Sequence, residues 1–548
     1  MAESRLLPDR PESRINRVVH FSERILASTI PWFVMFAVFV TVNAYIHRQW
    51  IWIYGDDQNL MMPAIDIGRG YTPNIDFING YAGLTYYVQR LVMLFTGELP
   101  ISEHVYTALQ AAFFGAVAAW ILRKWYPPAL VWLMVVFLWT GSHALNPTPN
   151  PGFVVQPLVL LAMVLMERLG RQGRLVDAAV AGALAGLAFL FKQYGIMIPV
   201  GFALYTSFAC LASPNGPQRL WLRVGIVLLN IGAFAGYFLV YLVRSVYMVP
   251  HGNPGAAASL PVSTVAFLSP WVFALACLVV LAVRPRPLLP RGLTLSGFLK
   301  ANVAFAGSFV AVAMVAFALI YGVSHESLHA LRVVLFTAPG YINGNIVAVD
   351  TLLLWPVALT CLLAMGPLVL KELRNPVLQM AVLIGIWAVV LFGARTYMNS
   401  SVTLVPTVVF FLLVATYLFA RPTGEAWSWF FVFVAGSVML AYLVPYPYYV
   451  FNMGILVVSG LAMMGTTFQS PWPRLVNPVG AVVLVWVLAL ALSDGQATMD
   501  SMPTYQVGSH RFQSYYPFGP MVDTANNSTP AEAQKELYEY LIYLAHLP

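Results

Sequence analysis

Charged residues are scarce in this sequence. Asp, Glu, Lys and Arg make up only 9% of its 548 residues, whereas 59% are hydrophobic, and the mean hydropathy is +0.74. A soluble globular domain has about 25% charged residues. The composition therefore excludes a soluble globular protein and predicts a polytopic membrane protein.

Cysteine and internal repetition are scarce as well. The sequence has three cysteines, Cys210, Cys277 and Cys361, and all lie in apolar runs, where a thiol behaves as a small apolar side chain. This placement supports neither a disulfide framework nor a zinc site. The chain shows no obvious repeat, and no Gly/Pro-rich linker separates two similar halves.

Apolar runs recur between Ser28 and Ser493. A helix of about 17 to 23 residues crosses a hydrocarbon core of roughly 30 Å. We therefore predict an all-α bundle of about 13 to 15 transmembrane helices. The candidate spans are 31–46, 104–122, 129–145, 154–166, 176–190, 196–211, 224–243, 265–283, 301–321, 351–370, 377–392, 403–420, 427–443, 450–464 and 479–492.

The loops between these spans predict an orientation, because Lys and Arg concentrate in cytoplasmic loops. With the N-terminus in the cytoplasm, about 20 of the 29 Lys and Arg residues fall on that side. The net charge of +7 then follows from topology and indicates no nucleic-acid partner. The polar start, residues 1–23, does not fit a cleavable signal peptide, so we expect the first helix to be retained. An odd number of spans places the C-terminus outside.

The chain divides into four predicted segments. Residues 1–24 form a cytoplasmic N-terminal segment, and residues 25–245 form a catalytic membrane module that includes the outer loop 48–103. Residues 246–493 form a second, variable membrane module. Residues 494–548 form a polar outer tail, in which 529–547 fits an amphipathic helix.

The outer loop 48–103 contains the most informative residues. Four of the 22 acidic residues follow the first span closely: Asp56, Asp57, Asp66 and Asp76. Neighbouring carboxylates raise each other's pKa, so a pair held beside a membrane indicates a hydroxyl group or cation that needs it. We take Asp56 as the candidate base, with Asp57 next. Asp76 would either support these groups from behind or orient the acceptor.

The rest of this loop predicts interfacial elements. Trp50, Trp52 and Tyr54 are typical of an aromatic belt at the membrane surface. A short helix interrupted or started at Pro63 should end near Gly68, and Pro73 predicts extended or turn structure before it. Residues 81–96 fit an amphipathic helix lying along the interface.

Cations that could meet an anionic substrate lie at other outer positions. Lys192 ends one span, and Arg395, Tyr397 and Asn399 lie in a short polar turn, 393–399. His325 and Arg332 share a stretch with Glu326 and His329 at helical spacing. We predict that Lys192, Arg395 and either Arg332 or His325 contact an anionic group of the substrate.

Each candidate also has a structural explanation. Asp56 or Asp57 could cap a helix, Asp66 could be solvated surface, and Asp76 could bond to the backbone of its own turn. Lys192 could extend to the interface, and Arg395 could pair with phospholipid headgroups. His325 and His329 could form part of a metal site, although no third ligand is evident.

Several of these motifs resemble the GT-C superfamily of polyprenyl-phosphate-sugar-dependent glycosyltransferases, particularly its lipid A aminoarabinose transferase and protein O-mannosyltransferase branches. The matching stretches are Asp56-Asp57, Gly70-Tyr71-Thr72-Pro73, Asp76-Phe77, Gly83-Leu84 and the small-residue helix from Gly186 that ends at Lys192. The likeness covers the first seven spans best. In the family the acidic pair is usually Asp-Glu, whereas this chain has Asp-Asp.

The resemblance implies a GT-C bundle with juxtamembrane helices in the first outer loop. It implies transfer of one sugar from a lipid-linked donor to a glycan, lipid or protein acceptor. The Trp-Trp-Asp signature of oligosaccharyltransferases is absent, which disfavours transfer of a whole oligosaccharide. These branches generally need no metal, although a divalent cation at Asp56 and Asp57 is an alternative. A bacterial inner membrane, with the site on its outer face, is the expected location.

A multipass transporter or lipid-linked glycan flippase is the rival function. Such a protein would have interrupted helices and ionisable groups near mid-membrane, often in two related halves. The acidic residues of this chain avoid the span centres, and the carboxylate cluster is interfacial. Sugar transfer therefore explains the sequence better.

Overall fold

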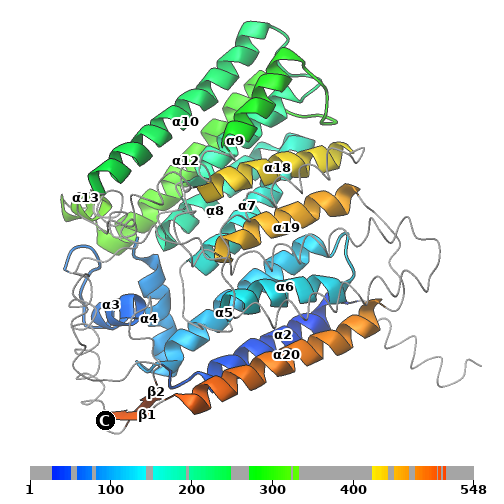
Figure 1. Cartoon of the computed structure of the whole chain (residues 1–548). Coiled ribbons are helices and arrows are strands. Elements are labelled where there is room, and N and C mark those ends of the chain that lie inside the picture. Colours follow the sequence, from blue (N-terminus) through cyan, green and yellow to red (C-terminus); the bar gives the residue numbers. More distant parts are fainter. Residues whose placement is uncertain are drawn as a thin grey trace, which may run out of the picture.

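A computed structural model of the chain shows a bundle of helices that run side by side (Figure 1). It describes residues 28–50, 58–76, 82–143, 152–192, 195, 197–248, 271–322, 325–332, 423–441, 450–467, 476–502, 504–507 and 510–513. The predicted spans 351–370, 377–392 and 403–420 lie outside these residues.

The long helices match the other predicted spans. They are α2 (Thr29–Ile46), α5 (Ile101–Leu122), α6 (Pro128–His143), α7 (Gly152–Gln172), α8 (Leu175–Phe191), α9 (Met197–Leu211), α10 (Leu220–Met248), the helix Trp271–Val283, α12 (Leu295–Tyr321), α18 (Gly424–Ala441), α19 (Val450–Thr467) and α20 (Val476–Ser501). Among the described helices, α2, α5, α12 and α20 are long and apolar enough to cross a membrane by length and composition. The chain is thus an all-α polytopic membrane protein, as predicted.

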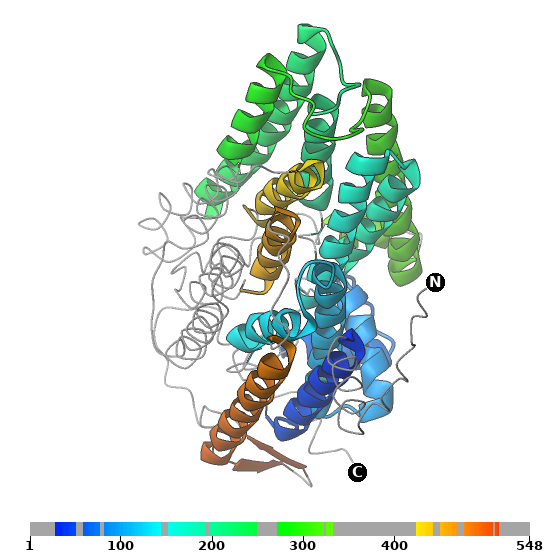
Figure 2. The ribbon, with the colours of Figure 1, turned by 90° about the vertical axis from the view of Figure 1, so that its right-hand side faces the viewer.

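The bundle has layers built from segments far apart in the sequence. In Figure 2, α20 lies beside α2, and α18 and α19 lie between the α5–α6 pair and the group containing α9 and α12. Many exposed side chains on these helices are apolar, including Val303 and Leu319 of α12. Such an exterior suits contact with lipid.

The small residues of α8 allow an unusually close contact with α12. A Cβ atom added to Gly186 would lie 2.7 Å from the carbonyl oxygen of Phe309, and one added to Gly182 would lie still closer to the carbonyl oxygen of Phe305. The two glycines are four residues apart, so they lie on one face of the helix. Helices in membranes use such small residues to bring their backbones together. This seam fixes the end of α8 relative to the end of α12.

Hydrogen bonds join α9 to two of its neighbours. Asn230 of α10 donates to Ser207 at 2.9 Å, and Asn302 of α12 donates to Thr206 at 3.0 Å. Amide side chains stabilise helix association where no water competes.

The two ends of the bundle differ in character. One, which we call the basic end, carries the turns with Arg123, Lys124, Arg174, Arg219, Arg284, Arg286 and Arg291. The other, which we call the loop end, carries α3 (Gln58–Gly68), α4 (Leu84–Thr96), α13 (His325–Arg332) and the strands β1 (Thr504–Val507) and β2 (His510–Gln513) (Figure 1). The two-stranded β1–β2 hairpin is antiparallel, with Thr504 opposite Gln513.

Three expectations about the loop end need correction. Pro63 lies inside α3, which therefore neither starts nor breaks there. Trp50 is buried, 2% exposed, so it is not part of an exposed aromatic belt; Trp52 and Tyr54 lie outside the described residues. The last span does not end at 492, because α20 continues to Ser501. The predicted helix 529–547 lies outside the described residues.

Candidate functional site

The structure describes only part of the predicted site. Asp76, Lys192 and His325 are described, and Arg332 is the last residue of α13. Five predicted residues lie outside the described part of the chain: Asp56, Asp57, Arg395, Tyr397 and Asn399. The Asp56-Asp57 pair directly precedes α3, which begins at Gln58.

Asp76 closes a tight turn that begins at Thr72. Its Oδ2 accepts a hydrogen bond from the Thr72 backbone N–H at 2.6 Å, and its own N–H donates to the Thr72 carbonyl at 3.0 Å. The backbone bonding expected as the structural alternative is therefore present. Asp76 is nevertheless exposed, and a carboxylate can accept several hydrogen bonds. Its role in the turn leaves acceptor capacity for a substrate.

Lys192 lies just beyond the last turn of α8. Its backbone N–H donates to Ala188, its φ and ψ are extended, and the residue is 2% exposed. A lysine that merely extended to the membrane surface would have an exposed end, so the burial of Lys192 disfavours that alternative. An ammonium group enclosed by protein requires compensating charge or hydrogen bonds. Lys192 thus brings cationic character into the loop end.

A small buried cluster brings side chains from several separate segments together. Leu190, Phe317, Tyr321 and Ala330 form its core, and Ile75 and Leu331 pack against it. We call this group the junction. It joins the turn that carries Asp76, the end of α8 that carries Lys192, and the helix α13 that carries His325 and Arg332. The segments that carry the residues predicted from distant parts of the sequence thus meet at one place.

Tyr321 links the junction to the outer loop by hydrogen bonds. Its hydroxyl group donates to the Ala82 carbonyl at 3.1 Å and accepts from the Asn74 side-chain amide at 3.2 Å. Asn74 is buried and has a φ of 61°, a left-handed conformation that asparagine tolerates better than most residues. Neither residue was predicted from the sequence. The Pro73-Asn74 turn was a local signal for Asn74, but nothing local marks Tyr321.

The histidines of α13 face solvent. His325, Glu326 and His329 are all exposed. Within the residues that the structure describes, no group of three or more His, Cys, Asp or Glu side chains could hold a metal ion. The ligands suggested at Asp56 and Asp57 lie outside those residues.

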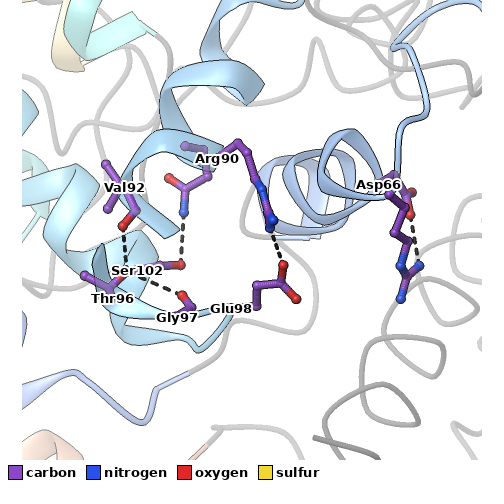
Figure 3. Close-up of polar contacts among 9 residues, drawn as sticks. Asp66, Arg90, Val92, Thr96, Gly97, Glu98 and Ser102 are labelled. Atoms are coloured by element: carbon purple, nitrogen blue, oxygen red, sulfur yellow. Dashed lines mark hydrogen bonds and ion pairs between the residues drawn. The ribbon is translucent and has the colours of Figure 1, made fainter. Parts of the chain in front are cut away.

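Polar contacts hold α4 against the start of α5 and close the end of α3 (Figure 3). Arg90 of α4 forms an ion pair with Glu98, and Gln89 donates to Ser102 at the start of α5 at 3.1 Å. Asp66 of α3 forms an ion pair with Arg69 at 3.0 Å. Asp66 is therefore a partly exposed surface residue, as its structural explanation predicted.

A buried histidine pair lies where α2, α5 and α20 meet. His47 bonds the Asn43 carbonyl at 2.8 Å, and His104 bonds the Trp50 carbonyl at 3.1 Å. The two imidazole rings are 6.1 Å apart. Burial lowers the pKa of His47 below its usual value, because the surrounding protein disfavours the charged ring.

The basic end has a separate set of ion pairs. Glu167 pairs with Arg171, Lys124 pairs with Glu425, and Arg168 lies 3.4 Å from Asp177. These contacts join α5, α7, α8 and α18 at the end opposite Asp76 and Lys192. We interpret them as structural.

The fold and the site define an integral membrane protein of helices with a polar site at one end of the bundle. No protein-family model matches the sequence, and no curated protein is significantly similar to it. Among solved structures, ArnT from Cupriavidus metallidurans in the apo state is 15% identical, covering 80% of this chain and 78% of that one, with a TM-score of 0.30. The same protein bound to undecaprenyl phosphate is 16% identical, covering 88% and 83%, with a TM-score of 0.31.

Proposed function

We propose that this protein transfers a single sugar from a polyprenyl-phosphate donor to an acceptor hydroxyl or amine. The observation that carries the proposal is the junction, which gathers the Asp76 turn, the Lys192 end of α8 and α13. The acidic motifs of the first outer loop support it independently. We place the reaction at the outer face of a bacterial inner membrane.

The chemistry needs a base and cations. A sugar on a lipid phosphate already carries its leaving group, so the enzyme must deprotonate the acceptor, align it and neutralise the departing phosphate. We assign the base to Asp56, with Asp57 as the second candidate. The acceptor oxygen or nitrogen attacks the anomeric carbon as the bond to the phosphate oxygen breaks, and the proton passes to the carboxylate. One displacement of this kind inverts the anomeric centre.

Lys192 is the described cation best suited to the phosphate. Its burial lowers the local dielectric, which strengthens attraction to an anion. We assign Arg395 and either Arg332 or His325 to the same phosphate, and Tyr397 and Asn399 to the donor. Asp76 orients the acceptor. No metal is obligatory in this scheme, and a divalent cation at Asp56 and Asp57 is the alternative to direct base catalysis.

The test is transfer of radiolabel from a panel of polyprenyl-phosphate monosaccharides by the purified protein. We expect Asp56→Asn, Asp57→Asn or both to abolish transfer while labelled lipid still binds. Asp66→Asn is the matched control, because Asp66 belongs to the same acidic stretch but pairs with Arg69. Its transfer rate should stay close to that of the wild type.

Two results would reject the assignment. If a correctly folded double variant, Asp56→Asn with Asp57→Asn, transferred sugar at the full rate, neither residue could be the base. Movement of labelled lipid across a vesicle membrane without consumption of any donor would favour the transporter or flippase instead.

A further inference from the structure

We propose that Tyr321 and Asn74 are positioning residues that hold the Asp76 turn in place beside the end of α8. This inference rests on the proposed sugar transfer and adds two residues that do not themselves contact the reacting atoms. It follows from the junction, from the backbone of the turn and from the seam between α8 and α12.

The first step concerns the anchor. Tyr321 is the last residue of α12, and α12 is held against α8 by Gly182 and Gly186. Lys192 directly follows α8. The close seam therefore fixes the Tyr321 ring relative to Lys192, since neither helix can slide without a clash between backbones.

The second step concerns the hydroxyl group. It spans two parts of the outer loop, because it bonds Asn74 on one side and Ala82 on the other. Gly83 leaves room for it: a Cβ atom there would lie 2.6 Å from the Tyr321 oxygen. Gly83 also has a φ of 100°, which side-chain-bearing residues rarely adopt. A glycine at position 83 thus provides the space that the Tyr321 oxygen occupies.

The third step concerns the turn itself. Asn74 and Ile75 face inward, one bonded to Tyr321 and the other packed on the junction, while the next residue, Asp76, is exposed. The Thr72–Asp76 hydrogen bonds make the turn a rigid unit. Anchoring Asn74 therefore sets the position of the Asp76 carboxylate, which the proposed reaction needs for the acceptor.

The decisive variants remove the hydrogen bond between Tyr321 and Asn74 and keep the shape of the ring or of the turn. Tyr321→Phe retains the ring but loses the hydroxyl group. Asn74→Gly retains a residue that accepts positive φ but loses the amide. Tyr126→Phe is the matched control, because the buried Tyr126 hydroxyl also donates one hydrogen bond, at 3.0 Å to Leu461, beside the basic end.

We expect Tyr321→Phe and Asn74→Gly each to lower kcat/KM for the acceptor about tenfold or more, because both remove the Asn74–Tyr321 hydrogen bond and Tyr321→Phe also removes the bond to Ala82. The double variant should lose about as much as Tyr321→Phe alone, and not about a hundredfold, because Tyr321→Phe already removes the hydrogen bond that Asn74→Gly breaks. The affinity for labelled donor lipid should not change. Amide hydrogen exchange at residues 72–76 should accelerate in both variants, and Tyr126→Phe should change neither transfer nor this exchange.

The remaining outcomes separate the two hypotheses. Suppose that the wild type transfers sugar and that Tyr321→Phe and Asn74→Gly leave both the transfer rate and amide hydrogen exchange at residues 72–76 unchanged. The positioning role would then be overturned, and the proposed function would stand. An equal loss of transfer in Tyr126→Phe would also overturn it, because the effect would then be general destabilisation. If the wild type transfers no sugar from any donor, the proposed function fails and the positioning role fails with it.

Discussion

Lys192 is the single residue whose environment is most unusual for its chemistry. A buried ammonium group binds an anion more strongly than an exposed one, because water screens it less. We predict that Lys192→Met weakens binding of polyprenyl phosphate about tenfold or more, the expected loss for one hydrogen bond to a charged group. Binding of labelled lipid to the purified protein measures this change.

The control for Lys192 is another lysine on the same bundle. Lys300 is exposed and lies near the start of α12, at the basic end. Lys300→Met should bind the lipid as the wild type does. Thermal unfolding curves establish that both proteins are folded. If Lys192→Met then binds polyprenyl phosphate with the affinity of the wild type, Lys192 does not belong to the phosphate site.

The lowered pKa of His47 predicts that the stability of the folded protein depends on pH. Its pKa is lowered in the folded state, whereas the unfolded chain has the ordinary value of about 6.5. As the pH falls through that value, the unfolded state takes up a proton and the folded state does not, so stability is lost on acidification. Neighbouring groups are His104, 6.1 Å away between ring centres, and Gly495 of α20.

The measurement is the unfolding temperature in detergent between pH 7.5 and 5.5. We expect a smaller decrease for His47→Gln than for the wild type, because the glutamine has no proton to gain. His329→Gln is the control, since His329 is exposed on α13. A decrease in His47→Gln as large as that of the wild type would show that His47 does not contribute.

At the scale of elements, the α8–α12 seam gives opposite expectations for one substitution at two positions. Gly186 lies against the backbone of α12, whereas a Cβ at Gly307 of α12 would meet nothing within 4 Å. Gly186→Ala should destabilise the protein by about 1 to 3 kcal/mol through overpacking. Gly307→Ala should leave stability unchanged or raise it by up to about 1 kcal/mol, because alanine favours helix.

Equilibrium unfolding of the two variants in mixed detergent tests this contrast. Gly186→Ala should also slow sugar transfer, since the seam places Lys192 relative to Tyr321. A stable and fully active Gly186→Ala protein, with Gly307→Ala behaving the same way, would show that the seam does not set this spacing.

The elements were predictable from the sequence to very different degrees. Apolar runs predicted α2, α8 and α9 almost to the residue, because a membrane span is fixed by length and hydropathy. They failed at the end of α20, where the helix continues through the polar residue Asp494 to Ser501. Helix continuation past a polar residue depends on local hydrogen bonding that hydropathy does not measure.

The candidate site was predictable only as separate residues. Asp76 and Lys192 could be selected because charge is rare in this chain, and rare charges beside spans indicate function. The contact between Asn74 and Tyr321 joins residues 247 positions apart, so no local pattern could indicate it. The burial of Trp50 was missed for a similar reason: its hydrogen-bond partner His104 lies in the first turn of a different helix, α5. The roles of Asp56, Asp57, Arg395, Tyr397 and Asn399 stay predictions.

For the whole molecule, the distribution of basic residues has a consequence for the orientation in the membrane. The described turns rich in arginine gather at one end, and α3, α4 and α13 lie at the other (Figure 1). Because basic loops remain in the cytoplasm, the loop end should face outward. A lipid-linked sugar at that face could then reach Lys192 without crossing the bilayer.

Labelling of single cysteines from each side of the membrane tests this orientation. In a protein with Cys210, Cys277 and Cys361 replaced by alanine, we place one cysteine at a time at Asn215 or Glu326, both exposed and at opposite ends of the bundle. In intact cells, a membrane-impermeant maleimide should label Glu326→Cys and should not label Asn215→Cys. After the membrane is opened, both should react.

The opposite labelling pattern would reverse the orientation of the protein in the membrane. If Asn215→Cys alone reacted in intact cells, the junction and Lys192 would face the cytoplasm. Sugar transfer could then still occur, but the proposal that it occurs at the outer face would be wrong. Reaction of both cysteines from outside would contradict the bundle itself, because α10, the helix Trp271–Val283 and α12 separate the two positions by an odd number of predicted crossings. The labelling result therefore tests the orientation separately from the chemistry, and transfer assays on the same cysteine variants would connect the two.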